Sequence, residues 1–169
     1  MAKAIQKVLV IDAEKCTGCE VCEFVCSMEH DGVFQPLHAR IRAIRIEPVI
    51  NMAIGCQFCL DAPCVHACPY KALKKSEDTG IITVDEDACV GCGFCIRACD
   101  FGAISFNLKT EKVQICDLCA NREGKPGEPA CVEYCPKECI ELTTLEAFSQ
   151  KTRKKAVNKL LESIAKQAK

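Results

Sequence analysis

Short strand-like stretches are the first pattern of apolar and polar positions along this chain. Residues 7–12 form a brief apolar run, and residues 40–47 alternate charged and aliphatic side chains with a period of two. A period of two is typical of a half-exposed β-strand. Residues 80–85 and 103–107 are shorter segments of the same kind. The pattern therefore predicts several short strands.

A different period begins at Thr143, where apolar positions recur every three or four residues. They are Leu145, Phe148, Thr152, Ala156, Leu160 and Ile164. This spacing predicts an amphipathic helix of about six turns, and Thr143 with Glu146 has the spacing of a capping box. Its basic side carries Lys151, Arg153, Lys154, Lys155 and Lys159. That side is either a solvated face or a patch for a membrane surface or an acidic partner. We expect two regions: residues 1–142, and a C-terminal amphipathic docking helix at 143–169.

Sixteen of the 17 cysteines fall into four runs. Run I (16–26) and run III (89–99) have the spacing C-x2-C-x2-C-x3-C. In this bacterial ferredoxin pattern three thiolates bind one cubane cluster, and the fourth binds a different cluster. Run II (56–68) has two additional residues between its second and third cysteines, and run IV (116–135) has the loop 120–130 there.

The sequence after the last cysteine of runs II, III and IV is an internal repeat in which a small residue precedes an aliphatic one. The small residue is Ala72 after run II, Ala103 after run III and Cys139 after run IV. Each block combines a loop, a helical turn and a strand, which predicts an α+β fold of duplicated ferredoxin-like units, two modules with two [4Fe–4S] clusters each. Cys139, which lies outside the ligand pattern, is either a small buried core residue or a spare ligand or redox thiol.

Taken together, the four runs resemble the four-cluster ferredoxin-type subunits that partner molybdenum and tungsten oxidoreductases, hydrogenases and formate dehydrogenases. The resemblance implies four [4Fe–4S] clusters and a nested pairing of run I with run IV and of run II with run III. The implied ligands are Cys16, Cys19, Cys22 and Cys135 (set 1), Cys26, Cys116, Cys119 and Cys131 (set 2), Cys56, Cys59, Cys64 and Cys99 (set 3), and Cys68, Cys89, Cys92 and Cys95 (set 4).

A narrower resemblance lies after run I. Residues 26–32, Cys-Ser-Met-Glu-His-Asp-Gly, and residues 39–42, Ala-Arg-Ile-Arg, are similar to the small subunits of cytoplasmic aldehyde-oxidoreductase-type tungsten enzymes. That group includes class II benzoyl-CoA reductase. Cys99 precedes Asp100 where the family commonly has proline, and this difference concerns only the surroundings of the linked clusters.

Composition and charge narrow the interpretation further. The sequence shows no signal-type h-region and no apolar run of about 18 residues, so we expect a cytoplasmic protein whose cysteines are metal ligands and not disulfides. The formal net charge of −1 counts the cysteines as neutral. Four clusters, each carrying about −2 with its thiolates, make the loaded protein acidic. This excess of negative charge argues against a nucleic-acid partner.

Zinc is the alternative metal for these cysteine runs, because C-x2-C pairs also build zinc sites. Runs I and III present three cysteines at equal spacing and a fourth close by, which suits zinc poorly. Run IV has two well-separated pairs and is the weakest case for a cluster when taken alone.

These features predict an electron-transfer subunit with no catalytic site of its own, since iron that is fully ligated by cysteine has no open coordination position. No nucleophile pair or Gly-rich nucleotide loop is readable. The expected partners are a large catalytic tungsten- or molybdenum-pterin subunit and a further electron-donor subunit or ferredoxin. The alternatives are a free-standing polyferredoxin, an electron-transfer subunit of a hydrogenase or formate dehydrogenase, and a metal-stabilised scaffold without a redox role.

The histidines leave two further possibilities open. His66 lies inside run II, where it either places a hydrogen bond or charge near a cluster or belongs to the surface of a helical turn. His30 and His38 flank the segment 27–38 and could contact a partner.

Overall fold

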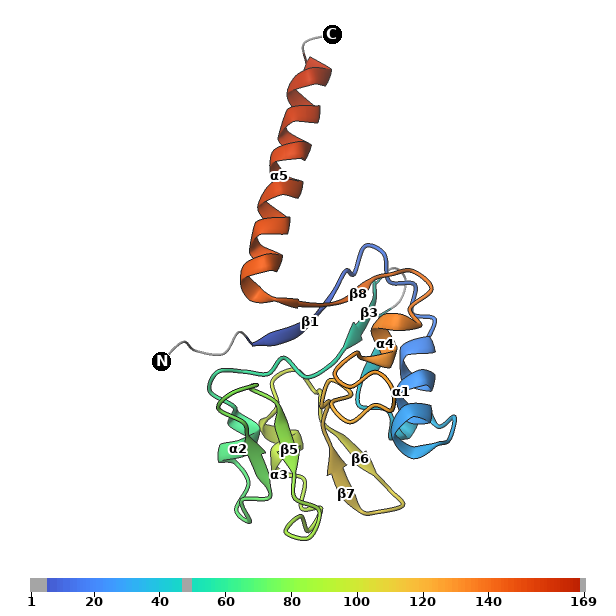
Figure 1. Ribbon diagram of the computed structural model, residues 1–169, viewed down its shortest axis with the longest axis vertical. Helices are drawn as coiled ribbons and strands as arrows, with labels where there is room; N and C mark the ends of the chain where they lie inside the picture. Colours follow the sequence, from blue (N-terminus) through green and yellow to red (C-terminus); the bar gives the residue numbers. More distant parts are fainter. Residues whose placement is uncertain (1–5, 47–49, 168–169) are drawn as a thin grey trace.

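The computed structural model describes residues 6–46 and 50–167, and within these ranges the strands form four two-stranded antiparallel sheets (Figure 1). The pairs are β1 (Lys7–Ile11) with β8 (Ile140–Thr144), β2 (Arg42–Ile46) with β3 (Ile50–Ile54), β4 (Leu73–Lys75) with β5 (Ile82–Val84), and β6 (Ser105–Asn107) with β7 (Lys112–Gln114). The α-helices are α1 (Val21–Asp31), α2 (Pro63–His66), α3 (Phe94–Ala98), α4 (Ala130–Glu133) and α5 (Leu145–Gln167).

The elements are nested along the chain, since the segment that holds runs II and III lies between the segments that hold runs I and IV. β1 pairs with β8 so that Lys7 lies opposite Thr144 and Ile11 lies opposite Ile140. α1 packs against α4, and α2 packs against α3. Runs I and IV thus belong to one unit, and runs II and III belong to the other. This arrangement confirms the predicted α+β fold of duplicated ferredoxin-like units.

The four strands that the sequence pattern predicted are present as β1, β2, β5 and β6, with shorter bounds. Residue 47, the last of the predicted strand 40–47, lies outside the described residues. The strands β3 and β7 were not predicted. β3 has the sequence INMAI, which carries no charged residue to mark alternation, and β7 has only three residues. A stretch of three residues is too short to display a period.

Segment 27–38 positions part of the site because α1 continues into it as far as Asp31. Gly32 ends the helix in the left-handed conformation (φ 66°), and its N–H donates to the carbonyl of Met28 at 3.0 Å. Glycine adopts this conformation without strain. The extension places His30 one turn after Cys26 on the same face of the helix.

The core of the described chain consists mainly of small aliphatic residues and cysteines. Phe58 and Ile41 are its largest fully buried side chains, each 1% exposed. A core of this kind supplies little hydrophobic stabilisation, because burial energy grows with the apolar area removed from water. The stability of the interior therefore depends on the metal that the cysteines are predicted to bind.

α5 begins one residue later than the predicted capping box implies. The hydroxyl Oγ1 of Thr144 accepts the backbone N–H of Ala147 at 3.2 Å, so Thr144 caps the helix in place of Thr143. The helix then projects away from the body of the molecule (Figure 1). Its apolar side chains stay exposed, from 38% for Phe148 to 63% for Leu160. None of the described helices has both the length and the hydropathy that a membrane crossing requires.

Removal of iron should unfold the body, since bound metal supplies folding free energy that the small core lacks. We expect anaerobic treatment with a strong iron chelator to abolish most of the far-ultraviolet circular dichroism of β-strands and short helices. A mock incubation without chelator is the control. A metal-free protein that keeps its native spectrum would contradict this expectation.

Candidate iron–sulfur centres

Cysteines from paired runs line three cavities in the body. One cavity is lined by set 1, Cys16, Cys19, Cys22 and Cys135, together with Cys139. A second is lined by set 3, Cys56, Cys59, Cys64 and Cys99. A third is lined by set 4, Cys68, Cys89, Cys92 and Cys95. Each cavity receives three cysteines from one run and one from the run paired with it.

The cysteines of set 2 come together in the interior, between α1 and run IV. All four, Cys26, Cys116, Cys119 and Cys131, are buried. Burial raises the pKa of Cys116 and of Cys131, and the nearby thiol of Cys26 raises both further. Burial also raises the pKa of Cys119 to about 11, and Cys26 again adds to it. Thiols that oppose one another's ionisation in this way are those that a metal cation would ionise together.

The spacing of the sulfur atoms suits a cluster and not a single ion. Zinc holds thiolates at about 2.3 Å, which places tetrahedral sulfur atoms about 3.8 Å apart. Among the described residues, the group of possible ligands whose atoms all lie within 4.8 Å of one another is His30, Asp117 and Cys119, and no three cysteines meet that limit. Four thiolates around an open cavity fit a cubane iron–sulfur core, and the chemistry of an all-sulfur donor set fits iron.

The fourth cysteine of every run accepts a backbone hydrogen bond on its sulfur. In runs II, III and IV the donor is four residues further along: Ala72 to Cys68 at 3.3 Å, Ala103 to Cys99 at 3.4 Å, and Cys139 to Cys135 at 3.4 Å. Run I differs because α1 continues past Cys26, and there Arg40 N–H donates at 3.3 Å. Hydrogen bonds to ligand sulfur stabilise the added negative charge of the reduced state.

Close packing explains the glycine within run III. Gly91 has φ 68°, and a Cβ there would lie 2.4 Å from the carbonyl oxygen of Glu111. Gly18 in run I is also left-handed, and a Cβ there would lie 2.8 Å from the side chain of Asn51.

A charged network of His30, Asp117 and Arg40 lies against set 2. His30 Nε2 is 3.0 Å from Asp117 Oδ1, and Arg40 Nη1 donates to Asp117 Oδ2 at 2.9 Å. His30 Nδ1 lies 2.8 Å from the carbonyl oxygen of Cys26 and 3.7 Å from its Sγ. Sequence reasoning missed Asp117 and Arg40, although the position of Asp117 between two cysteines of run IV is a signal that could have found it.

The two partners of this network hold each other in the charged form. Burial would lower the pKa of His30, but its bonds to Asp117 and Cys26 prevail and raise the pKa to about 10. Burial would raise the pKa of Asp117, but the bond to His30 and the charge of Arg40 lower it to about 2. A fixed positive charge therefore lies beside the sulfur of Cys26.

The other two histidines differ in exposure. The His66 side chain is 72% exposed and lies 2.7 Å from the exposed carboxylate of Asp61, which is the surface position that the sequence left open. The His38 side chain is 17% exposed and lies 2.7 Å from the carboxylate of Asp31. His38 therefore points inward in the described structure.

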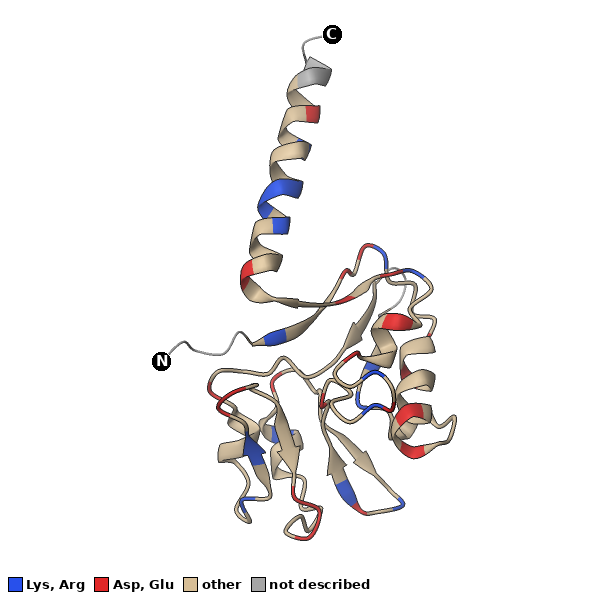
Figure 2. Ribbon diagram, viewed as in Figure 1, with Lys and Arg blue, Asp and Glu red and all other residues tan. Residues whose placement is uncertain are grey.

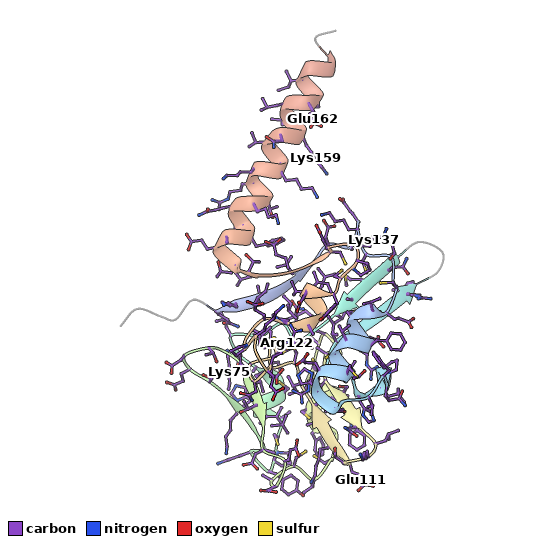
Figure 3. All side chains as sticks on the ribbon, turned by 45° about the vertical axis from the view of Figure 1, so that its right-hand side comes forward. Lys75, Glu111, Arg122, Lys137, Lys159 and Glu162 are labelled. Atoms are coloured by element: carbon purple, nitrogen blue, oxygen red, sulfur yellow. The ribbon has the colours of Figure 1, made fainter. Side chains whose placement is uncertain are left out.

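The loop 120–130 is closed by one arginine. Arg122, whose side chain is 7% exposed, contacts Glu29 of α1 at 3.0 Å and Glu133 of α4 at 2.7 Å. Its guanidinium also donates to the carbonyl of Glu128 at 3.0 Å. Figure 3 shows Arg122 within the body of the molecule. This side chain links the two helices that carry cysteines of sets 1 and 2.

Comparisons with known proteins agree with this geometry. A family model described as "4Fe-4S dicluster domain" matches residues 49–145, more than half of the chain. The aliphatic sulfonate oxidoreductase, polyferredoxin-like subunit, of Pyrococcus furiosus is 42% identical over 127 residues, which are 75% of this chain and 70% of that protein. The probable anaerobic dimethyl sulfoxide reductase chain YnfG of Escherichia coli K12 is 32% identical over 163 residues, covering 83% and 75% respectively.

A solved structure is also similar. The active site complex BamBC of benzoyl coenzyme A reductase bound to benzoyl-CoA contains a chain with 28% sequence identity and a TM-score of 0.49. The match covers 81% of this chain and 78% of that one.

Substitution Asp117→Asn should destabilise the protein, because it leaves His30 and Arg40 half-buried without an anionic partner. We expect a loss of about 2 kcal/mol, below the 3–5 kcal/mol of fully buried pairs, or a thermal midpoint about 4–8 °C lower. The ion pair of His30 with Asp117 contributes its full stabilising free energy between pH 3.8 and 6.5, the ordinary pKa values of the two groups. Its contribution falls as the pH drops towards 2 or rises towards 10.

The measurement is the anaerobic thermal loss of circular dichroism. The matched control is Asp61→Asn, which removes the partner of the exposed His66. Equal midpoints for both variants would show that the buried network adds nothing to stability.

Proposed function

The chain belongs to the family of proteins with a 4Fe-4S dicluster domain, and from this premise we propose that it is the electron-transfer subunit of a larger oxidoreductase. Single electrons pass through four [4Fe–4S] clusters to or from a catalytic subunit with a molybdenum- or tungsten-pterin cofactor. The observation that carries the proposal is the convergence of cysteines from paired runs on three shared cavities, with sulfur atoms spaced too far apart to hold a single ion.

We assign one cluster to each set of four cysteines. The three cavities support sets 1, 3 and 4, and the mutual effect of the buried thiols on their pKa supports set 2. Within each assigned site three cysteines come from one run, and the fourth is borrowed from the run paired with it. A bound cluster supplies one-electron storage at each site.

The four sites follow one another as 1, 2, 3 and 4. Sets 1 and 2 both draw on runs I and IV, sets 3 and 4 both draw on runs II and III, and in every run the third and fourth cysteines are four residues apart. In run I both of these cysteines lie on α1, where four residues rise about 6 Å. The two halves meet at residues 115 and 116, since Ile115 lines the cavity of set 3 and Cys116 belongs to set 2. This sequence of contacts makes a continuous path for electrons.

Exposure supports entry and exit at the two ends of that path. Cys19 of set 1 and Cys92 of set 4 are exposed. Every cysteine of set 2 is buried, and the cysteines of set 3 are buried or half-buried. Electrons would therefore reach or leave the protein at set 1 and set 4 and cross sets 2 and 3 in the interior.

The chain itself would perform no substrate chemistry. Four cysteine ligands per cluster leave no open coordination position for a substrate, and the role is therefore confined to transfer. None of the 17 cysteines forms a disulfide in the structure, which suits a reducing compartment, and we propose the cytoplasm. A donor subunit or a ferredoxin would meet one end of the path.

α5 would anchor the catalytic subunit. The helix exposes Val157, Leu160, Leu161 and Ile164 at 54–63%, and its described charges are basic in excess: Lys151, Arg153, Lys154, Lys155 and Lys159 against Glu146 and Glu162. Figure 2 shows basic residues on the helix, and Figure 3 shows Lys159 and Glu162 well away from the body. A second copy would oppose like charges, so the complementary surface is an apolar groove with an acidic rim.

Anaerobic purification under mild conditions tests the proposal. We expect about sixteen iron and sixteen sulfide per chain, the content of four cubanes, and co-elution with a large metal–pterin protein. A lone monomer with the same iron content would favour the free-standing polyferredoxin. Zinc in place of iron would overturn the proposal altogether.

The role of α5 predicts a specific loss of assembly. With the catalytic subunit co-expressed, Leu160→Asp combined with Leu161→Asp should remove co-elution, because each change buries a charge in an apolar contact. Asn158→Asp, elsewhere on the same exposed helix, is the matched control and should co-elute normally. Iron content should stay unchanged in both. Retained co-elution of the double variant would rule out docking through this face.

A further inference from the structure

The seventeenth cysteine lies inside the cavity of set 1. Cys139 is 6% exposed and lines that cavity with the four cysteines of the set. Its Sγ is 3.4 Å from the Sγ of Cys135, and it also contacts the thiol of Cys16. Cys139 therefore adjoins two assigned ligands of one cluster.

The internal repeat supplies a comparison within the same molecule. Ala103 lines the cavity of set 3, and Ala72 lines the cavity of set 4. Each donates its backbone N–H to the fourth cysteine of its run, as Cys139 does, at 3.3–3.4 Å. At this position, set 1 therefore differs from sets 3 and 4 by one thiol group.

The thiol of Cys139 can act only as a donor towards its neighbour. A cysteine that binds iron is deprotonated, so Cys135 would offer a thiolate sulfur without a proton. Cys139 is not among the sixteen assigned ligands, and a cysteine thiol that binds no metal carries its proton at neutral pH. The contact is then an S–H···S hydrogen bond to a charged acceptor.

Such a bond is stronger when the acceptor carries more negative charge. Reduction adds one electron to the cluster and its thiolates and moves no proton in this scheme. The hydrogen bond therefore stabilises the reduced state more than the oxidised state, and the reduction potential rises.

We propose that Cys139 is a positioning residue whose thiol hydrogen bond to Cys135 raises the reduction potential of the set 1 cluster. The proposal rests on the ligand assignment given under the proposed function. Set 1 lies at the end of the electron path nearest α5, where Lys155 contacts Glu14 at 3.4 Å, two residues before Cys16. The bond thus favours residence of the electron at the end of the path where we expect the catalytic subunit.

The test is a redox titration, monitored by electron paramagnetic resonance, of the complete protein and of Cys139→Ala. Alanine is the residue that the repeats carry at this position, so folding and about sixteen iron per chain should be retained. We expect one of the four couples to lose about tenfold in its equilibrium constant for reduction, which is about 59 mV for one electron. Cys139→Ser should restore part of the loss, because a hydroxyl also donates.

The reciprocal variant Ala103→Cys adds a thiol beside Cys99 and should raise the potential of a different couple, that of set 3. Unchanged potentials in Cys139→Ala or in Ala103→Cys would overturn the proposal. Loss of about four iron from Cys139→Ala would also overturn it, because Cys139 would then be a ligand or a structural requirement. A parent protein without iron would instead refute the proposed function, which separates the two failures.

Discussion

One turn of helix between two cysteines is the constraint on which the rest of the structure depends. On α1, Cys22 faces the cavity of set 1, and Cys26, four residues later, belongs to set 2. The rise of the helix fixes the step between them at about 6 Å. The same four-residue step recurs in the other three runs. In run I the helix therefore sets the distance between the two neighbouring sites, and in the other runs the fourth cysteine lies one or two residues beyond the end of its helix.

The surrounding structure holds these helices in pairs. Arg122 joins α1 to α4 through Glu29 and Glu133, and the pair of His30 with Asp117 ties the end of α1 to run IV. These contacts are ionic, and they add to a core in which few large apolar side chains are fully buried. Ion pairs thus supply part of the stability that an aliphatic core supplies in other small domains. They also lie next to the sulfur ligands and affect the electrostatics of those ligands.

Spacing made much of this protein predictable from sequence. The four runs, the repeat after Cys68, Cys99 and Cys135, and the apolar period after Thr143 gave the α+β fold and the helix, since each depends on local geometry. Contacts between distant segments were less accessible. Arg40 approaches Cys26 from 14 residues away, and Asp117 reaches His30 across 87 residues, so no local period records either contact. β3 and β7 lacked an alternating pattern long enough to recognise. The ligand sets remain a prediction.

The unequal exposure of the cysteines also bears on how the protein would fail in air. Dioxygen attacks an iron–sulfur core where it can reach it, and the reachable edges are those at Cys19 and Cys92, at opposite ends of the assigned path. All four cysteines of set 2 are buried. Oxidative damage would then begin at the two termini of the relay and disconnect it from its partners while the innermost cluster was still intact.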